Sequence, residues 1–221
     1  MKKTKKSFWY RNGLVLAFLA LTLFSLSLQI YTGLIQYNNF LEDHHIASVS
    51  LGRYMISGHF LQATFENWES EFLQMGLFVW FTVFLKQKGS SESKKIDGEE
   101  PVDRPPVKHK NAPWPVKKGG WVLKLYEHSL SLALFALFFI SFILHWIGSH
   151  QDFNERQLLE GKPGQSFILY LANSRFWFES FQNWQSEFLS VCAIIFLSIY
   201  LREKGSPQSK PVDAPHSQTG E

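Results

Sequence analysis

Cysteine is nearly absent from the chain, and its scarcity narrows the chemistry that the protein can perform. Cys192 is the only cysteine among the 221 residues. An intrachain disulfide and a cysteine-based metal site are therefore both excluded. Because Cys192 lies inside an apolar run, we expect it to be a small apolar residue that packs in the interior or faces lipid.

The sequence motifs of common catalytic centres are also missing. The chain contains no G-x-S-x-G, no H-E-x-x-H and no glycine-rich loop that could cradle a phosphate. We therefore predict a protein that is not an enzyme and that carries no cofactor.

Charge is missing from two long stretches. No charged residue occurs in residues 13–40, and residues 130–144 are again uncharged and almost wholly apolar. A helix needs about 20 apolar residues to cross a hydrocarbon core of about 30 Å, so both stretches predict transmembrane helices. The first stretch also resembles a secretory signal peptide. Because it exceeds the ~7–15 apolar residues usual for a signal and lacks an A-x-A-like cleavage site, we expect an uncleaved helix.

Two shorter apolar runs, residues 72–85 and 188–201, each follow a nearly identical hexapeptide, NWESEF or NWQSEF. Each run holds 14 residues, which is about 21 Å of helix at ~1.5 Å per residue and too short to cross a membrane alone. Each helix must therefore begin earlier, and we predict that Asn67 and Asn183 are the N-caps of these two helices.

Lysine and arginine are scarce on one side of the predicted membrane. Five precede the first helix, ten lie in residues 86–124, three lie beyond residue 201, and the other segments hold only four. The N-terminal segment, the central linker and the tail thus hold eighteen lysines and arginines, and the segments on the other side hold four. Because these residues resist translocation, this asymmetry predicts that both termini and the central linker are cytoplasmic. We expect contact with the lipid bilayer and with anionic lipid at its cytoplasmic face. We expect no nucleic-acid partner, since no folded basic surface is evident.

The two halves of the chain repeat each other. Adding 116 to a residue number aligns them without a gap, and thirteen of thirty positions are identical between residues 65–94 and 181–210. This pattern predicts an internal duplication of a two-helix unit. Because each unit crosses the membrane twice, both copies should have the same orientation, related by an axis along the membrane normal.

The predicted fold is all-α: an integral membrane four-helix bundle formed by two parallel two-helix repeats, with short interfacial helices in the outer loops. Gly58 and Ser174 should lie near bends in these loops. The linker and the tail are polar and should be disordered. The first predicted repeat covers residues 1–88, with membrane crossings at about 13–36 and 67–88. The second covers residues 121–204, with crossings at about 126–148 and 183–204. A disordered cytoplasmic linker at 89–120 joins the repeats, and a disordered cytoplasmic tail follows at 205–221.

Several segments resemble those of a known family. They are GHFLQATFENWESEFLQMG and RFWFESFQNWQSEF, each followed by KGS, together with APWPVKKGGWVLKLYEHSLSLALF. These segments resemble a family of small bacterial four-helix integral membrane proteins of unknown function, built from a duplicated two-helix unit. The resemblance implies the bacterial cytoplasmic membrane as the location, and it supplies no activity and no site residue.

A polar stripe marks the start of the second helix in each repeat. At 100° per residue, four residues of each copy share one helix face: Asn67, Ser70, Glu71 and Gln74 in the first, and Asn183, Ser186, Glu187 and Ser190 in the second. Such a stripe should face protein or water. If the two stripes face each other, Glu71 and Glu187 approach as like charges, and one would bind a proton or a small cation. The alternative is that the stripes mark helix ends and hold helices together.

Histidines supply two further candidates. The EDHH segment at residues 42–45 and His59 contain metal-ligand types, but the aligned segment of the second repeat is LLEG, so we expect exposed loop residues and no metal. His145 lies inside the third predicted helix and aligns with Gln29. We expect an interhelical hydrogen bond from His145, with a proton relay as the alternative.

These features favour a multi-pass membrane protein of unknown activity with a structural, regulatory or partner-binding role. Its partner would be a second copy of the chain or an unknown membrane protein. The alternative is a small proton or cation transporter or channel that uses the symmetric polar stripes.

Overall fold

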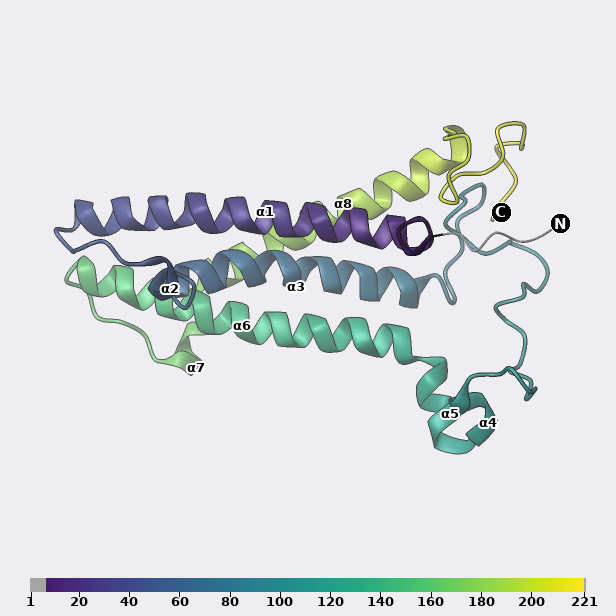
Figure 1. The fold of residues 1–221 in the computed structure, drawn as a ribbon, viewed down its shortest axis with the longest axis horizontal. Coiled ribbons are helices and arrows are strands. Elements are labelled where there is room, and N and C mark those ends of the chain that lie inside the picture. The colour runs from purple at the N-terminus through teal and green to yellow at the C-terminus, as the bar shows by residue number, and fades with distance from the viewer. Residues whose placement is uncertain (1–6, 221) are drawn as a thin grey trace. The chain divides into compact units, whose positions relative to one another are not determined.

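The computed structural model describes residues 7–220, which form helices joined by turns and loops, with no strand in this range (Figure 1). The all-α prediction is therefore confirmed for these residues. Eight helices lie within the range, and their bounds are α1 Phe8–Asp43, α2 Leu51–Tyr54, α3 Gly58–Phe81, α4 Trp114–Lys118, α5 Gly120–Glu127, α6 Ser129–Leu159, α7 Phe167–Tyr170 and α8 Ser174–Tyr200.

The chain divides into two compact units. The first contains the described residues up to Gln62 together with Ile147–Ser166, and the second contains Ala63–Trp146 together with the described residues from Phe167 onward. Helices α1 and α2 belong to the first unit, and α4, α5, α7 and α8 belong to the second. The boundary falls within α3 and α6, so each of these helices contributes to both units.

Two helices of the described chain, α1 and α6, are long and apolar enough to cross a membrane. Both extend beyond the predicted crossings, α1 at both ends and α6 as far as Leu159. Helices α3 and α8 do not meet the same test, because polar and charged residues occupy their first halves. Four of the lysines used to predict the topology lie at positions 2–6, outside the described residues.

The predicted N-caps of the two hexapeptide helices are wrong. Helices α3 and α8 begin nine residues before Asn67 and Asn183. Each asparagine lies inside its helix and donates to the backbone carbonyl oxygen four residues earlier, at 2.8 and 3.0 Å. No glycine or proline lies between Gly58 and the first hexapeptide, so nothing in the sequence interrupts the helix there.

The observed caps lie at the loop positions where bends were expected. The Ser57 hydroxyl accepts the backbone N–H of Phe60 at 3.2 Å, just before α3. The Asn173 side chain caps α8 by accepting the backbone N–H of Arg175 at 2.9 Å. Gly58 and Ser174 are the first residues of the two helices. A side-chain oxygen at this position satisfies one of the backbone donors that a helix start leaves open.

The two helices also end earlier than predicted, α3 at Phe81 and α8 at Tyr200. After α8, the Arg202 guanidinium donates to the backbone carbonyl oxygens of Ser198 and Ile199, at 3.3 and 3.2 Å. A cationic side chain at a helix C-terminus satisfies exposed carbonyl groups and complements the helix dipole. Arg202 therefore stabilises the end of α8 from outside the helix.

The order of the helices repeats with the spacing seen in the sequence. Helices α2 and α7 each have four residues, and they begin 116 positions apart. Helices α3 and α8 also begin 116 positions apart, at Gly58 and Ser174. The residues that precede them, Ser57 and Asn173, have the same spacing and the same capping role. Equivalent positions thus start equivalent helices.

The first unit packs around a small aromatic core. Tyr37, Leu41, Tyr54 and Phe60 are its buried members, drawn from α1, α2 and α3. Side chains of this size contribute about 1.5–3 kcal/mol each when fully buried. This core therefore fixes the short helix α2 against its longer neighbours.

Glycines allow α3 and α6 to approach closely within the first unit. A Cβ atom on Gly58 would collide with the backbone of α6 at Asp152, and one on Gly148 would collide with the backbone of α3 at Gln62. Small residues at such contacts are typical of packed membrane helices. Any larger residue at either glycine must push the two backbones apart.

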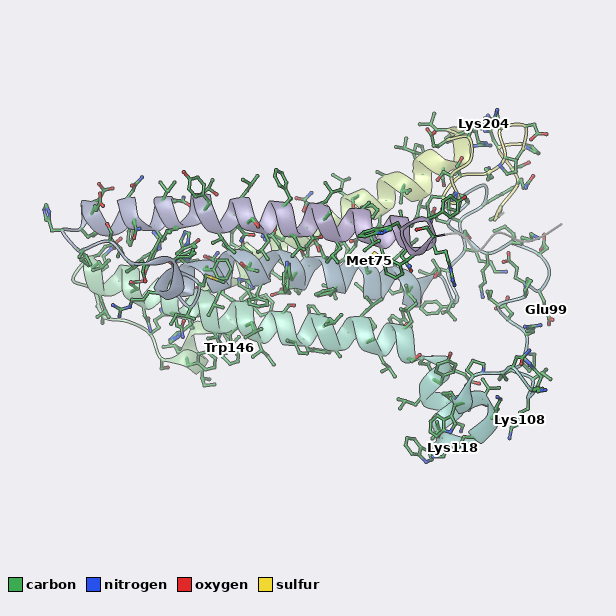
Figure 2. The ribbon with its side chains drawn as sticks, in the orientation of Figure 1. Met75, Glu99, Lys108, Lys118, Trp146 and Lys204 are labelled. Atoms are coloured by element: carbon green, nitrogen blue, oxygen red, sulfur yellow. The ribbon has the colours of Figure 1, made fainter. Side chains whose placement is uncertain are left out.

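Trp146 joins α6 to α7 in the second unit (Figure 2). Its ring stacks on that of Phe167, with centroids 3.9 Å apart and an angle of 13° between the planes. Its indole nitrogen also donates to the backbone oxygen of Phe167 at 3.2 Å. The stacking and the hydrogen bond together position the start of α7.

Part of the predicted linker forms a short helix. Helix α4 lies inside residues 89–120, and the Lys118 ammonium lies 4.9 Å from the ring centroid of Trp114 and 6.0 Å from that of Trp121 (Figure 2). In the tail, Lys210 is buried, and its ammonium donates to the backbone oxygens of Gly89, His216 and Gln218. The disorder of both segments stays a prediction.

Candidate functional site

His145 lies at the centre of a buried charged cluster in the second unit. Its side chain belongs to α6 and is 0% exposed. The ring Nδ1 lies 2.8 Å from Glu69 Oε2 of α3, and the ring Nε2 lies 3.3 Å from Glu179 Oε2 of α8. Glu69 is 0% exposed and Glu179 is 7% exposed. One imidazole therefore bridges two carboxylates from two other helices, and we call these three residues the His145 cluster.

Three residues of α8 surround the cluster. Trp184 Nε1 donates to Glu69 Oε1 at 2.8 Å, and Arg175 Nε donates to Glu179 Oε1 at 2.7 Å. The buried ring of Phe176 packs on the imidazole, with centroids 4.9 Å apart. Every oxygen of the two carboxylates thus has a partner, as buried charges require.

The positions of the two ring nitrogens set a minimum number of protons. A neutral imidazole has one N–H and one lone pair, whereas an ionised carboxylate can only accept a hydrogen bond. Because both nitrogens face carboxylate oxygens, the two contacts need one proton more than a neutral histidine and two ionised carboxylates carry. If the imidazole holds that proton, His145 and Arg175 together balance the charges of Glu69 and Glu179. The cluster is therefore suited to hold one titratable proton.

Glu66 extends the cluster by one turn of α3 and introduces a second type of ligand. One oxygen of Glu66, one ring nitrogen of His145 and one oxygen of Glu179 lie within 4.8 Å of one another. Imidazole nitrogen and carboxylate oxygen are ligands that suit a divalent cation such as zinc. A metal requires neutral histidine, so a cation at these residues and the extra proton would exclude each other.

The predicted polar stripe of α3 does not have uniform surroundings. Ser70 is 1% exposed and its hydroxyl donates to the backbone oxygen of Asn67 at 2.8 Å, whereas Asn67 and Glu71 are exposed. Gln74 is half-buried. The Glu71 carboxyl lies near enough to Glu187 for their like charges to repel. The structure thus brings one pair of the predicted site residues within electrostatic range.

The remaining stripe residues of α8 bond within their own helix. The Ser186 hydroxyl donates to the backbone oxygen of Asn183 at 2.9 Å, and the Ser190 hydroxyl donates to that of Glu187 at 2.8 Å. Serines in helices commonly bond back in this way. Ion or proton binding by the two stripes therefore stays a prediction.

The EDHH segment and His59 make local contacts in the first unit. Glu42 accepts a hydrogen bond from a serine hydroxyl six residues later, and His44 Nδ1 lies 2.8 Å from a backbone oxygen one turn earlier. His59 Nδ1 lies 3.2 Å from the Tyr54 hydroxyl. Burial raises the pKa of Tyr54, so this phenol stays protonated at neutral pH. Among the residues described, metal-ligand types converge around His145 instead.

The first unit contains polar contacts that the sequence analysis did not predict. The Tyr37 hydroxyl of α1 lies 2.7 and 2.8 Å from the two carboxylate oxygens of Glu155 in α6 and donates to them. Arg156 pairs with buried Asp152 at 2.8 Å, and its guanidinium lies 4.4 Å from the ring centroid of Phe40. These contacts join α1 to the end of α6.

Sequence reasoning identified His145 but missed its partners. The polar stripe was predicted from residues that share one helix face, and Glu69, the residue at which the hexapeptides differ, lies on the opposite face of that helix. The aligned residues of the other repeat carry no charge: Gln29 for His145, Gln185 for Glu69, Gln182 for Glu66 and Ala63 for Glu179. The informative signal is therefore an ionisable residue in one repeat that aligns with an uncharged residue in the other.

Comparison with known proteins gives one match. A family described as Domain of unknown function (DUF6766) matches residues 5–221. The chain belongs to this family. The DUF6766 description agrees with the expected membership of an uncharacterised family, and it carries no activity that could be assigned to the His145 cluster. No curated protein and no solved structure matches the chain.

Proposed function

We propose that this DUF6766 chain is a multi-pass protein of the bacterial cytoplasmic membrane, with both termini cytoplasmic. In this proposal α1, α3, α6 and α8 cross the bilayer as two copies of one duplicated unit. Three observations support it: the length and apolar character of α1 and α6, the 116-residue spacing of equivalent helices, and the uneven distribution of lysine and arginine.

We further propose that the His145 cluster takes up and releases a proton, and that the protein transports protons or a cation in exchange for protons. One observation carries this proposal: both ring nitrogens of a fully buried histidine face carboxylate oxygens. Ionisable residues inside membrane helices are costly, and they typically mark ion pathways or proton relays.

Release of the proton would weaken contacts between helices. A neutral His145 would direct a lone pair at one of the two carboxylates, and the two acceptors would repel each other. The contacts with Glu69 and Glu179 join α6 to α3 and to α8. Proton binding would thus favour one arrangement of the three helices over another, as proton-coupled transport requires.

Glu71 and Glu187 supply the next proton acceptors in this proposal. They lie on α3 and α8, the helices that carry Glu69 and Glu179, and their charges repel. A proton on either carboxyl removes that repulsion. The pair could therefore receive a proton that the cluster releases, in line with the stripe hypothesis.

A structural or regulatory role is the second candidate, and it is favoured by the complete pairing of the cluster. Both oxygens of Glu69 and both oxygens of Glu179 have hydrogen-bond partners. A fully paired polar network can specify helix packing without exchanging a proton. Under this proposal the protein would present a fixed surface to a membrane partner or to a second copy. Neither candidate function is enzymatic.

Proton flux in proteoliposomes distinguishes the two candidates. The full chain is reconstituted, a pH gradient is imposed, and the internal pH is followed with a trapped dye. We expect the native protein to dissipate the gradient faster than empty liposomes do. His145→Gln, which introduces the residue type found at the aligned Gln29, should abolish the additional flux.

The matched control is Glu160→Gln. Glu160 lies just after α6, and its hydrogen bond with Lys162 holds its pKa below the usual range, so it is ionised at neutral pH. This variant should keep the native flux, because Glu160 is exposed and accepts its hydrogen bond from nearby Lys162. A folded native protein with no flux above empty liposomes would overturn the transport proposal and leave the structural role.

A further inference from the structure

A cavity lies in the second unit, between the second halves of α3 and α8. Its volume is about 860 Å³. On α8 it extends from Phe188 to Phe196, which is ~12 Å of helix axis at ~1.5 Å per residue. The volume lies within the range of ~300–1,000 Å³ that is usual for small-molecule sites. The cavity is therefore large enough for a ligand.

The cavity has mainly apolar walls, to which Gln74 and Thr82 add two uncharged polar side chains, and its charged residues gather at one end. The walls include Leu77, Phe78, Phe81, Leu85, Val191 and Ile195. The polar end follows the C-terminus of α3 and contains Lys86, Gln87, Glu92 and Ser93. A site of this kind fits a ligand with a long apolar part and a single polar head.

Lys86 gives the polar end a preference for an anion. Its ammonium has three N–H donors, of which one is used on the backbone oxygen of Ile96 at 2.9 Å. The acid at the same end, Glu92, faces the Gln208 side-chain amide, whose nitrogen donates to it at 2.8 Å in the amide orientation that satisfies both groups. Asp103, which is close enough to interact with Lys86, is paired with Lys94 at 2.8 Å. Lys86 therefore has donors for a further acceptor.

We infer that the cavity holds an acyl chain of an anionic membrane lipid, with the lipid phosphate at Lys86. The inference rests on the proposed topology, which places Lys86 at the cytoplasmic face, where anionic lipids concentrate. One leaflet is about 15 Å deep, half of a hydrocarbon core of about 30 Å. The ~12 Å of α8 along the cavity therefore corresponds to a chain within that single leaflet.

The single cysteine reports on occupancy without any added label. Cys192 is exposed and lines the cavity. We would measure its alkylation by a small membrane-permeant maleimide, with the full chain in nanodiscs of phosphatidylcholine alone or with added phosphatidylglycerol. A bound chain should shield the thiol, so phosphatidylglycerol is expected to slow the alkylation.

Lys86→Gln should reduce the slowing of Cys192 alkylation by phosphatidylglycerol about fivefold. This is the contribution to lipid binding expected of one lysine near anionic lipid. Lys88→Gln is the matched control, because Lys88 is exposed, lies two residues away and does not line the cavity. This variant should keep the native protection. If Lys86→Gln does not fold, native mass spectrometry of the wild-type chain should still find bound phosphatidylglycerol.

Equal alkylation in both lipid mixtures, with no lipid retained in the mass spectrum, would overturn the inference. Equal protection by a free fatty acid in phosphatidylcholine would also overturn it, because the occupant would then not be a membrane phospholipid. His145→Gln should keep the lipid effect, since His145 does not line the cavity. Failure of the lipid site and failure of the proton site can therefore be told apart.

Discussion

The hexapeptides NWESEF and NWQSEF differ at one residue, and the surroundings of that residue differ strongly. Glu69 is fully buried and is bonded to His145 and Trp184, whereas Gln185 at the same place in the second hexapeptide is exposed. The following serines differ in the same way, with Ser70 buried and Ser186 exposed. Similar sequences therefore occupy dissimilar places in this protein.

The comparison separates two kinds of position. Positions that keep the same role in both repeats, such as the caps Ser57 and Asn173, start equivalent helices. Positions at which they differ determine where charge is buried, because an ionised side chain is stable in the interior only beside a partner. His145, Glu69 and Glu179 supply each other with such partners, and the aligned residues of the other repeat carry no charge.

The largest difference should follow the loss of the central imidazole. His145→Leu leaves Glu69 and Glu179 facing an apolar side chain, and loss of one partner of a buried charged pair costs about 3–5 kcal/mol of unfolding free energy. Gln29→Leu, at the aligned position, removes no charge and should cost about 1–3 kcal/mol. Denaturant unfolding in detergent measures both values. Equal losses would show that the cluster contributes no more than its uncharged counterpart.

A reciprocal exchange at the variable hexapeptide position should give the next effect. Glu69→Gln weakens hydrogen bonds that involve a charged group, worth about 1.5–3 kcal/mol. Gln185→Glu changes an exposed side chain and should alter the unfolding free energy by less than about 0.5 kcal/mol. The same unfolding experiment compares the two variants. A larger loss for Gln185→Glu would reverse the assignment of the buried site.

A second reciprocal exchange concerns the first residues of α3 and α8. Gly58→Ser places a Cβ against the backbone of α6, and overpacking of this kind costs about 1–3 kcal/mol. Ser174→Gly changes an exposed residue and should cost no more than about 1 kcal/mol. Thermal unfolding of the two variants measures the difference. A tolerated Gly58→Ser would mean that α3 and α6 do not approach closely.

The smallest effect should occur where the two repeats behave alike. Ser57→Ala and Asn173→Ala each remove an N-cap and should cost about 1 kcal/mol. Asn67→Ala and Asn183→Ala, at the caps predicted from the hexapeptides, should each cost less than about 0.5 kcal/mol. Helix content and unfolding free energy are measured for all four variants. If the Asn67→Ala and Asn183→Ala variants lost more stability than the Ser57→Ala and Asn173→Ala variants, the helices would start at the hexapeptides.

Much of the helical framework follows from the sequence. The long apolar stretches predict α1 and α6, since few other structures accommodate so many apolar residues in succession. Their ends were missed because charged and polar residues beyond the apolar stretch continue the helix, as at Glu155 of α6. The start of α3 was missed because Asn67 is a good cap by type but lies in a segment without a helix breaker.

The candidate site depends on contacts that one sequence does not reveal. His145 was noticed because it interrupts an apolar helix. Its pairing with Glu69 and Glu179 depends on how three helices pack, and their positions along the chain are far apart. Trp184 likewise acts through a tertiary contact with Glu69, although its type and position alone are typical of a membrane interface. Arg175 pairs with Glu179 one turn later on the same helix, and this pair joins the cluster only because Glu179 contacts His145.

The proton on the His145 cluster can be measured directly. Nitrogen-15 solid-state NMR of the full chain in lipid bilayers at neutral pH reports the protonation of both ring nitrogens, and the His145 signal is assigned by its loss in His145→Gln. Because each nitrogen faces a carboxylate oxygen, we predict that both are protonated and that His145 is an imidazolium. A neutral ring with a single N–H would contradict this account.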